Sequence, residues 1–431
     1  MDNIIKQRIA DIRRGNVPAG YKRTKLGIIP HDWQTPRLNS VLSENKERNR
    51  SGRFGKEDVL SVSGEFGVTN QIELLGRSFA GASTLDYHVV EFGNIVYTKS
   101  PLKSNPYGII KLNRGAAGIV STLYAVYECR SNEIGVYLDY YFSIDRNVNN
   151  YLRPLVRKGT KNDMKINNED ALKGGIVLPP PEEISRIIEI LGCCDREIAL
   201  KKELIAEKKR QKKALMQKLL IPDSGFRLPG FIGEWKKTTI GEIGTFAKGK
   251  GIQNSQCQKS GLPCVKYGDI YMKYNVSFDV AESFTTSDVF NGSLQVTSGV
   301  LLFTCSGEDS REIGKCTLYT GERTIAVGGD IIVMYPHELI SPAFLAYQQY
   351  SDDLIRQKNA FGKGNSIVHI HLPEISSLKI ALPPTRQEQQ AIADILSAAD
   401  REIDLLEKEL AQQEQKKKSL MQLLLTGTAR V

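Results

Sequence analysis

The stretch GTFAKGKG (Gly244–Gly251) has the G-x-x-x-x-G-K spacing of loops that bind nucleotide phosphates. In such loops a Ser or Thr follows the lysine and its hydroxyl holds magnesium, whereas Gly251 follows Lys250 here. No amphipathic helix follows to supply the usual strand-to-helix context. The stretch therefore argues against an ATP site and indicates either a basic loop that approaches a DNA backbone or an ordinary surface turn.

Two other stretches have only part of a chemical motif. NPYG (Asn105–Gly108) is similar to the N-P-P-Y motif of adenine methylation with one proline missing, and no Gly-rich cofactor loop accompanies it, so it predicts a turn. HIH (His369–His371) places two imidazoles on one face of an extended segment, but a metal needs three or four protein ligands. With no nucleophile-elbow spacing and no paired carboxylates, the sequence predicts no metal site and no catalytic residue.

Two loops mix cations with glycine and small hydrogen-bond donors, which suits contacts with DNA phosphates and base edges. They are RKGTKN (Arg157–Asn162) and GKGNS (Gly362–Ser366), each shortly before a Leu-Pro-Pro segment. Solvated loops without a role remain the alternative. The candidate DNA-binding residues, including weaker ones outside these loops, are Lys99, Lys103, Asn105, Arg157, Lys158, Thr160, Lys161, Asn162, Lys248, Lys250, Ser306, Arg311, Lys363, Asn365 and Ser366.

Composition agrees with a nucleic-acid partner. The 431 residues include 58 Lys and Arg against 49 Asp and Glu, a net charge of +9 that favours polyanions. The seven cysteines form no C-x-x-C pair, so they indicate neither a disulfide framework nor a zinc site, and a reducing cytoplasm fits best. No apolar run approaches the roughly 18 residues of a membrane span, so no membrane partner is expected.

Two long helices must position these loops. DREI occurs at Asp195–Ile198 and again 205 residues later at Asp400–Ile403, and each copy is followed by LMQ and a Leu-Leu pair. Apolar residues recur around both copies at alternating three- and four-residue steps, which predicts a coiled-coil seam. The seam residues are Ile187, Leu191, Ile198, Ile205, Leu215, Leu219, Ile392, Leu396, Ile403, Leu406, Leu410, Leu420 and Leu424.

Lysines interrupt the first seam at Lys201, Lys208 and Lys212, and their stems are expected to lie along it with the charges in water. The basic run EKKRQKK (Glu207–Lys213) is interpreted as a solvated helix face, with subunit docking as the alternative.

The repeat divides the chain into five segments. They are an N-terminal helix (1–21), a first globular region (22–180), a central helix (181–225), a second globular region (226–384) and a C-terminal helix (385–431). Short β-branched and aromatic runs followed by a helical stretch predict α+β regions with small mixed or antiparallel sheets. The regions share landmarks such as IVLPP (Ile176–Pro180) and IALPP (Ile380–Pro384) but otherwise diverge, which indicates one mechanical role and two recognition roles.

The connection between the helices indicates their direction. The second region begins where the first helix ends and ends where the second helix begins. Parallel helices of about 40 residues would separate those points by nearly 60 Å, far more than the radius of gyration of about 15 Å expected for a domain of this size. The sequence therefore predicts an antiparallel coiled coil.

The doubled DREI helices, the Leu-Pro-Pro segments, Trp33 and Trp235 near the start of each region, and the closing LLLTGTARV (Leu423–Val431) together resemble the specificity subunit of type I restriction-modification systems. The resemblance covers essentially the whole chain. Small departures are Cys193-Cys194, where the second copy has Ala398-Ala399, and three prolines against two in the first linker.

This resemblance implies a non-catalytic subunit that recognises a bipartite, asymmetric double-stranded DNA target, one half-site per region. It implies two adenine-N6 methyltransferase subunits and two restriction subunits as partners, which would hold the S-adenosylmethionine, ATP and magnesium. A coiled-coil DNA-binding scaffold without sequence preference is the alternative function.

Overall fold

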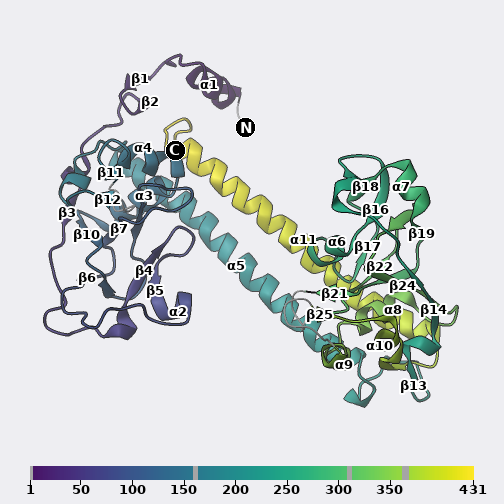
Figure 1. The fold of residues 1–431 in the computed structure, drawn as a ribbon. Helices are drawn as coiled ribbons and strands as arrows, with labels where there is room; N and C mark the ends of the chain where they lie inside the picture. The colour runs from purple at the N-terminus through teal and green to yellow at the C-terminus, as the bar shows by residue number, and fades with distance from the viewer. Residues whose placement is uncertain (1–2, 159–163, 308–312, 362–367) are drawn as a thin grey trace. The chain divides into compact units, whose positions relative to one another are not determined.

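Two helices of 39 residues each, α5 (Pro181–Leu219) and α11 (Arg386–Leu424), organise the fold. The computed structural model describes residues 3–158, 164–307, 313–361 and 368–431 and divides into two units (Figure 1). Unit 1 consists of Met1–Lys201 and Glu409–Val431, and unit 2 of Lys202–Lys408. Each unit therefore combines one globular region with part of both long helices, while the division into five numbered segments stays a prediction.

Unit 1 is built from short strands and helices that precede α5. In chain order they are α1 (Asn3–Arg13), β1 (Tyr21–Thr24), β2 (Gly27–Pro30), η1 (Leu38–Ser40), β3 (Leu42–Glu44), η2 (Lys56–Asp58), β4 (Leu60–Ser63), β5 (Gly67–Asn70), α2 (Gln71–Leu75), β6 (His88–Val90), β7 (Ile95–Thr98), β8 (Ile109–Leu112), β9 (Gly118–Val120), β10 (Tyr124–Cys129), α3 (Asn132–Phe142), α4 (Asp145–Leu152), β11 (Arg157–Lys158), β12 (Met164–Lys165) and η3 (Asp170–Leu172).

The main sheet of unit 1 is antiparallel, in the order β3-β10-β7-β8. Its central strand β7 is buried along its whole length, because Ile95 and Tyr97 face the aromatic core while Val96 faces a second apolar cluster. Helix α3 closes the aromatic core with Tyr137, whose hydroxyl donates to the carbonyl of Val177 at 3.0 Å. The sheet therefore fixes the point where β7 ends, next to the candidate Lys99.

Among the described residues, unit 2 contains more strands than unit 1. In chain order its elements after α5 are η4 (Pro222–Ser224), β13 (Lys236–Thr239), η5 (Ile240–Glu242), β14 (Gly244–Lys248), η6 (Asn254–Gln256), β15 (Cys257–Gln258), β16 (Leu262–Val265), α6 (Tyr267–Met272), β17 (Ser277–Phe278), β18 (Ser283–Thr285), α7 (Ser287–Gly292), β19 (Leu294–Val296), β20 (Val300–Thr304), β21 (Ser306–Gly307), β22 (Cys316–Tyr319), β23 (Ile325–Val327), β24 (Ile331–Pro336), α8 (Pro342–Gln348), α9 (Asp352–Phe361), β25 (Val368–His369), α10 (Leu372–Ser377) and β26 (Lys379–Leu382).

The larger sheets described in unit 2 are two five-stranded ones, in the orders β14-β24-β20-β22-β17 and β15-β18-β16-β23-β19. Both are mixed, because β17 pairs with β22 and β16 with β23 in parallel. Strand β20 is buried throughout and pairs with β24 on one side and β22 on the other. Its end therefore has a fixed position, from which Cys305 and Ser306 continue toward β25.

The long helices pair in antiparallel fashion within each unit. In unit 1 Lys201 of α5 contacts Glu409 of α11 at 2.6 Å, and in unit 2 Lys208 contacts Glu402 at 2.6 Å. The apolar residues at the predicted heptad positions are buried or partly buried, and Leu191 is fully buried. The α+β class and the antiparallel coiled coil predicted from the sequence are thus confirmed.

The expectation that the seam lysines hold their charges in water is wrong. The ammonium groups of Lys201 and Lys208 contact carboxylates of the opposite helix, and Lys212 contacts Asp400 in the same way. Within the run EKKRQKK, Lys209 also pairs with Glu407 at 2.7 Å. Much of this basic run therefore forms ion pairs between the two helices.

Candidate nucleic-acid interface

The first DREI motif attaches the globular region of unit 1 to its helices. The hydroxyl of Tyr140 on α3 donates to Asp195 Oδ2 at 2.6 Å, and the ammonium group of Lys417 on α11 contacts Asp195 Oδ1. The same ammonium group lies 5.4 Å from the centre of the Tyr140 ring, a cation–π distance. Asp195 thus joins both long helices to the region that they carry.

Unit 2 repeats this arrangement with the second DREI motif. The hydroxyl of Tyr347 on α8 donates to Asp400 Oδ2 at 2.7 Å, Lys212 of α5 contacts Asp400 Oδ1, and its ammonium group lies 5.7 Å from the Tyr347 ring centre. The aspartates and the lysines are each 205 residues apart in the sequence. This cluster explains why the chain contains the motif twice.

A buried glutamate near the start of each long helix makes a second repeated contact. In unit 1 Glu183 accepts from Trp33 Nε1 at 2.8 Å and from Arg430 Nε at 2.7 Å, and the hydrogen bond with Glu183 is the main cause that raises the pKa of Arg430. In unit 2 Glu388 accepts from Arg227 Nε and Nη2 at 2.9 and 2.7 Å. In each unit the arginine comes from the segment after the other long helix: Arg430 follows α11, and Arg227 follows α5.

The candidate Lys99 lies just beyond β7 and is half-buried. Its ammonium group donates to Asn168 Oδ1 at 2.6 Å, and the Asn168 amide donates to Glu44 Oε1 at 2.7 Å. Burial lowers the pKa of Lys99, and the carboxylate of Glu44 acts in the opposite direction. Lys99 therefore ties the end of the main sheet to the segment before the first linker, while Lys103 is exposed.

Asn105 is not suited to contact DNA, contrary to the prediction. Its side chain is buried and its Nδ2 donates to Asp145 Oδ1 at 2.9 Å. The amide of Gly108 donates to the carbonyl of Asn105 at 3.1 Å, so NPYG forms the predicted turn. A Cβ at Gly108 would meet the Thr98 carbonyl at 1.9 Å, which explains the glycine at its end.

Arg157, unlike Asn105, is exposed to solvent. It lies on β11 and lines a groove of about 690 Å³ together with Lys165, Lys173, Asn167 and Asp170. Three cations against one carboxylate give the groove the charge expected of a phosphate-binding surface. Lys158 belongs to the same strand. The candidates Thr160, Lys161 and Asn162 lie outside the described residues.

In unit 2 the predicted cations lie on a strand and in the turn after it. Gly244–Lys248 is β14, which pairs with β24, so the glycine-lysine pattern lacks the geometry of a phosphate loop. Lys248 and Lys250 are both exposed. Lys248 pairs with Ile332 on β24, and Ile332 pairs with Phe303 near the end of β20. Burial raises the pKa of the Cys305 thiol to about 11, the charge of Asp330 adds to this effect, and the charge of Lys248 opposes it. The structure thus brings Lys248 close to the end of β20.

Ser306 lies at the same strand end and is buried. Its Oγ is 3.0 Å from Nδ1 of His369, which occupies the paired position on β25. The hydroxyl of Tyr271 on α6 donates to the carbonyl of Ser306 at 2.8 Å. The candidates Arg311, Lys363, Asn365 and Ser366 lie outside the described residues.

Sequence reasoning missed His369, Tyr271 and Asn168 as members of these sites. The HIH pattern by itself suggests only metal binding, and within the described ranges no group of three or more His, Cys, Asp or Glu side chains could hold a metal ion. The available signal was position, because His369 and Asn168 both lie shortly before the Leu-Pro-Pro segments.

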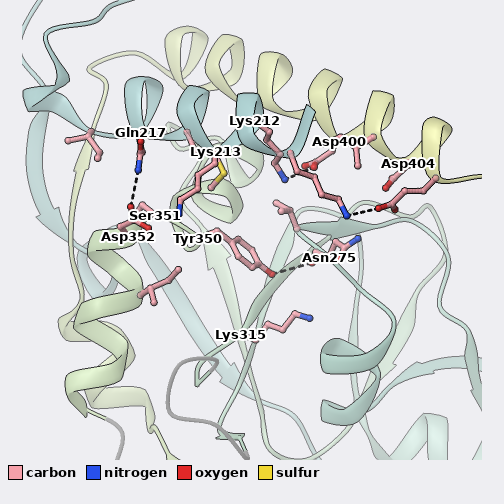
Figure 2. Close-up of a pocket in the computed structure, with 17 residues that line it drawn as sticks. Lys212, Lys213, Gln217, Asn275, Lys315, Tyr350, Ser351, Asp352, Asp400 and Asp404 are labelled. Carbon is pink, nitrogen blue, oxygen red and sulfur yellow. Dashed lines mark hydrogen bonds and ion pairs between the residues drawn. The ribbon is translucent and has the colours of Figure 1, made fainter. Parts of the chain in front are cut away.

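A separate groove of about 650 Å³ lies in unit 2, between the helices and the globular region (Figure 2). Several of its charged and polar side chains already contact one another: Lys212 contacts Asp400, and Gln217 Nε2 donates to Asp352 Oδ2 at 3.3 Å. These contacts make it a weaker candidate for DNA than the end of β20. None of the helices in the described residues combines the length and apolar character of a membrane span.

Comparison with known proteins shows which family this arrangement is similar to. Residues 232–415 match the family described as type I restriction modification DNA specificity domain. The type I restriction enzyme MjaVIII specificity subunit of Methanocaldococcus jannaschii is 28% identical over 275 residues, which is 59% of this chain and 62% of that protein. The chain thus spans less than two thirds of this relative. A putative MjaX specificity subunit from the same organism is 25% identical over 95% of this chain and 97% of its own length.

Solved structures show a similar fold. The type I restriction-modification S subunit from M. genitalium has a TM-score of 0.55 and 15% identity, covering 91% of this chain and 96% of that one. A chain from a structure on complex assembly and conformational transition of the type I R-M system also has a TM-score of 0.55 and 15% identity, covering 93% and 99%. At this identity the likeness concerns the fold alone.

Proposed function

We propose that this chain, whose resemblance to the specificity subunits of type I restriction-modification systems is confirmed, selects the DNA sequence on which such a complex acts. Each globular region reads one half-site of a bipartite target. Because the two regions differ in sequence, the two half-sites differ and the target is asymmetric.

The observation that supports this proposal is a set of contacts that occurs in both units and forms a common frame. The contacts of Asp195 and Asp400, and those of Glu183 and Glu388, attach each region to the helices in the same way. The strand ends beyond this frame differ, with Lys99 bonded to Asn168 in unit 1 and Ser306 to His369 in unit 2. A constant support with different side chains at the strand ends is what two independent readers of DNA require.

The chemistry of the complex is assigned to partner subunits. Two methyltransferase subunits bind S-adenosylmethionine, two restriction subunits bind ATP and magnesium, and this chain holds them at the target. The coiled coil, with ion pairs between α5 and α11 in each unit, supplies the helical part of that scaffold.

The test is to express the chain with the methyltransferase of its own system and map N6-methyladenine across the host genome. Methylation at one bipartite, non-palindromic sequence supports the proposal. The purified chain alone should neither methylate nor cleave DNA. Methylation spread over unrelated sequences would favour the alternative, a basic coiled-coil scaffold without sequence preference.

A further inference from the structure

Beside the end of β20 in unit 2 lies the exposed imidazole of His369, a residue of β25 that is hydrogen-bonded to Ser306. Ser306 and His369 are directly paired in the short antiparallel sheet of β21 and β25. Next to this pair, the amide of Ile370 donates to the carbonyl of Cys305 at 2.9 Å. The backbone on the Cys305 and Ile370 side of the pair is therefore held in place.

The hydrogen bond between Ser306 Oγ and His369 Nδ1 involves only one of the two ring nitrogens. Ser306 is 8% exposed, whereas His369 is exposed, so the contact at Nδ1 faces the protein. The ring of His371 lies nearly parallel to that of His369, with 6.3 Å between the centres. Among the described residues, Nε2 of His369 has no hydrogen-bond partner, and the contact at Nδ1 restricts the orientation of the ring.

Further hydrogen bonds hold the backbone of Ser306 in position. Tyr271 donates its hydroxyl to the Ser306 carbonyl at 2.8 Å and accepts from Thr304 Oγ1 at 2.8 Å. Lys315 donates to the Tyr271 carbonyl at 3.1 Å. Support of this kind is needed where a side chain must be positioned accurately for recognition.

Unit 1 offers an internal comparison. Counted back from the Leu-Pro-Pro segments, Met164 and Lys165 of β12 correspond to Val368 and His369 of β25. The first position is buried in both units, at 6% and 7% exposure. The second is exposed in both and differs in chemistry, as expected where two half-sites are read differently.

We propose that His369, oriented by Ser306, contacts a base edge in the half-site read by unit 2, through one hydrogen bond from Nε2 in the major groove. This inference rests on the proposed function. Exposed Lys248 and Lys250 would contact the adjacent phosphates, which position the protein without selecting sequence.

The test maps methylation by the complete complex carrying His369→Ala or Ser306→Ala. His369→Ala should reduce discrimination at one base pair of one half-site about tenfold or more and leave the other half-site unchanged. Ser306→Ala should relax the same base pair to a smaller extent, because it frees the ring without removing it.

His337→Ala is the matched control. His337 is another exposed histidine of unit 2, and it follows the end of β24 that pairs with Gly244, whereas Lys248 lies at the other end of β14. Its methylation pattern should equal that of the unaltered complex. Thermal unfolding of each purified variant checks that the chain remains folded.

The outcomes separate the two proposals. If the unaltered complex methylates without a defined target, the proposed function fails. If it has a defined target and His369→Ala retains the same preference at every base pair, or loses binding equally on all sequences, the base-reading role of His369 is overturned.

Discussion

Lys417 of α11 contacts the carboxylate of Asp195 on α5, a residue 222 positions earlier in the sequence. Tyr140 donates to the same carboxylate, and Asp400, Lys212 and Tyr347 repeat the three-residue cluster in unit 2. The cluster joins three segments that are distant in the sequence, so its loss should be detected as a loss of stability in the unit that contains it.

Replacing Asp400 by Asn should lower the unfolding free energy of unit 2 by about 1–3 kcal/mol, because a charged acceptor for two donors is lost. Denaturant unfolding combined with hydrogen exchange in unit 2 would measure this. Glu402→Gln is the control, since it removes only the half-exposed pair with Lys208, worth about 1 kcal/mol or less. Equal losses in both variants would contradict the role given to the cluster.

The buried pair of Glu388 and Arg227 should be far more sensitive to the loss of one partner. Glu388 is 1% exposed, so Arg227→Met leaves a carboxylate buried without its cation and should cost about 3–5 kcal/mol. Adding Glu388→Gln should recover part of that loss in denaturant unfolding. Arg356→Met, which removes an exposed pair with Asp353, should have little effect.

Lys358 should give unit 2 a pH-dependent stability. Burial lowers the pKa of this lysine from 10.5 to about 8, and its ammonium group donates to the carbonyls of Gln349 and Gly314 at 3.0 and 3.3 Å. Between these pKa values the unfolded chain binds more protons than the folded one, so raising the pH favours folding.

The unfolding free energy of the unaltered chain, relative to Lys358→Met, should therefore rise as the pH increases from about 8 toward 10.5 and stay level below about 8. Chemical denaturation of both chains across this range provides the measurement. A difference that declines as the pH rises would show that the folded state favours the charged lysine.

Exchanging residues 22–180 for the corresponding region of a related subunit should change one half-site of the methylated target and preserve the other. The reason is that the contacts to α5 and α11 use a small set of residues, including Trp33 and Tyr140, which the replacement must retain. Genome-wide methylation mapping would follow the exchange. A change in both halves would mean that the regions do not read DNA independently.

Periodicity was sufficient to predict the long helices, because each heptad position is a local property of the sequence. Leu191 and Leu396 are fully buried at predicted seam positions. The partners of Lys201 and Lys212 could not be predicted, since they lie 208 and 188 residues away and depend on how the antiparallel helices align.

The candidate DNA contacts were harder to predict, because they too depend on partners that are distant in the sequence. Residue type alone selected Asn105, but its burial against Asp145 depends on the packing of α4. Residue type also gave no reason to connect His369 with Ser306, which are adjacent only after β21 and β25 pair. Short polar stretches indicate where recognition is possible, and the sheet determines which side chains are available for it.

The position of Arg430 has a consequence for the order in which the protein matures on the ribosome. Unit 2 is one continuous stretch, whereas unit 1 needs Glu409–Val431, and Arg430 binds both Glu183 and Asp32. Domains usually fold in the order of their synthesis, N-terminal first. Here the globular region of unit 1 is translated first, but its contacts are complete only after Arg430 has been synthesised. Until then Glu183 and Asp32 lack the cation that they bind in the folded protein.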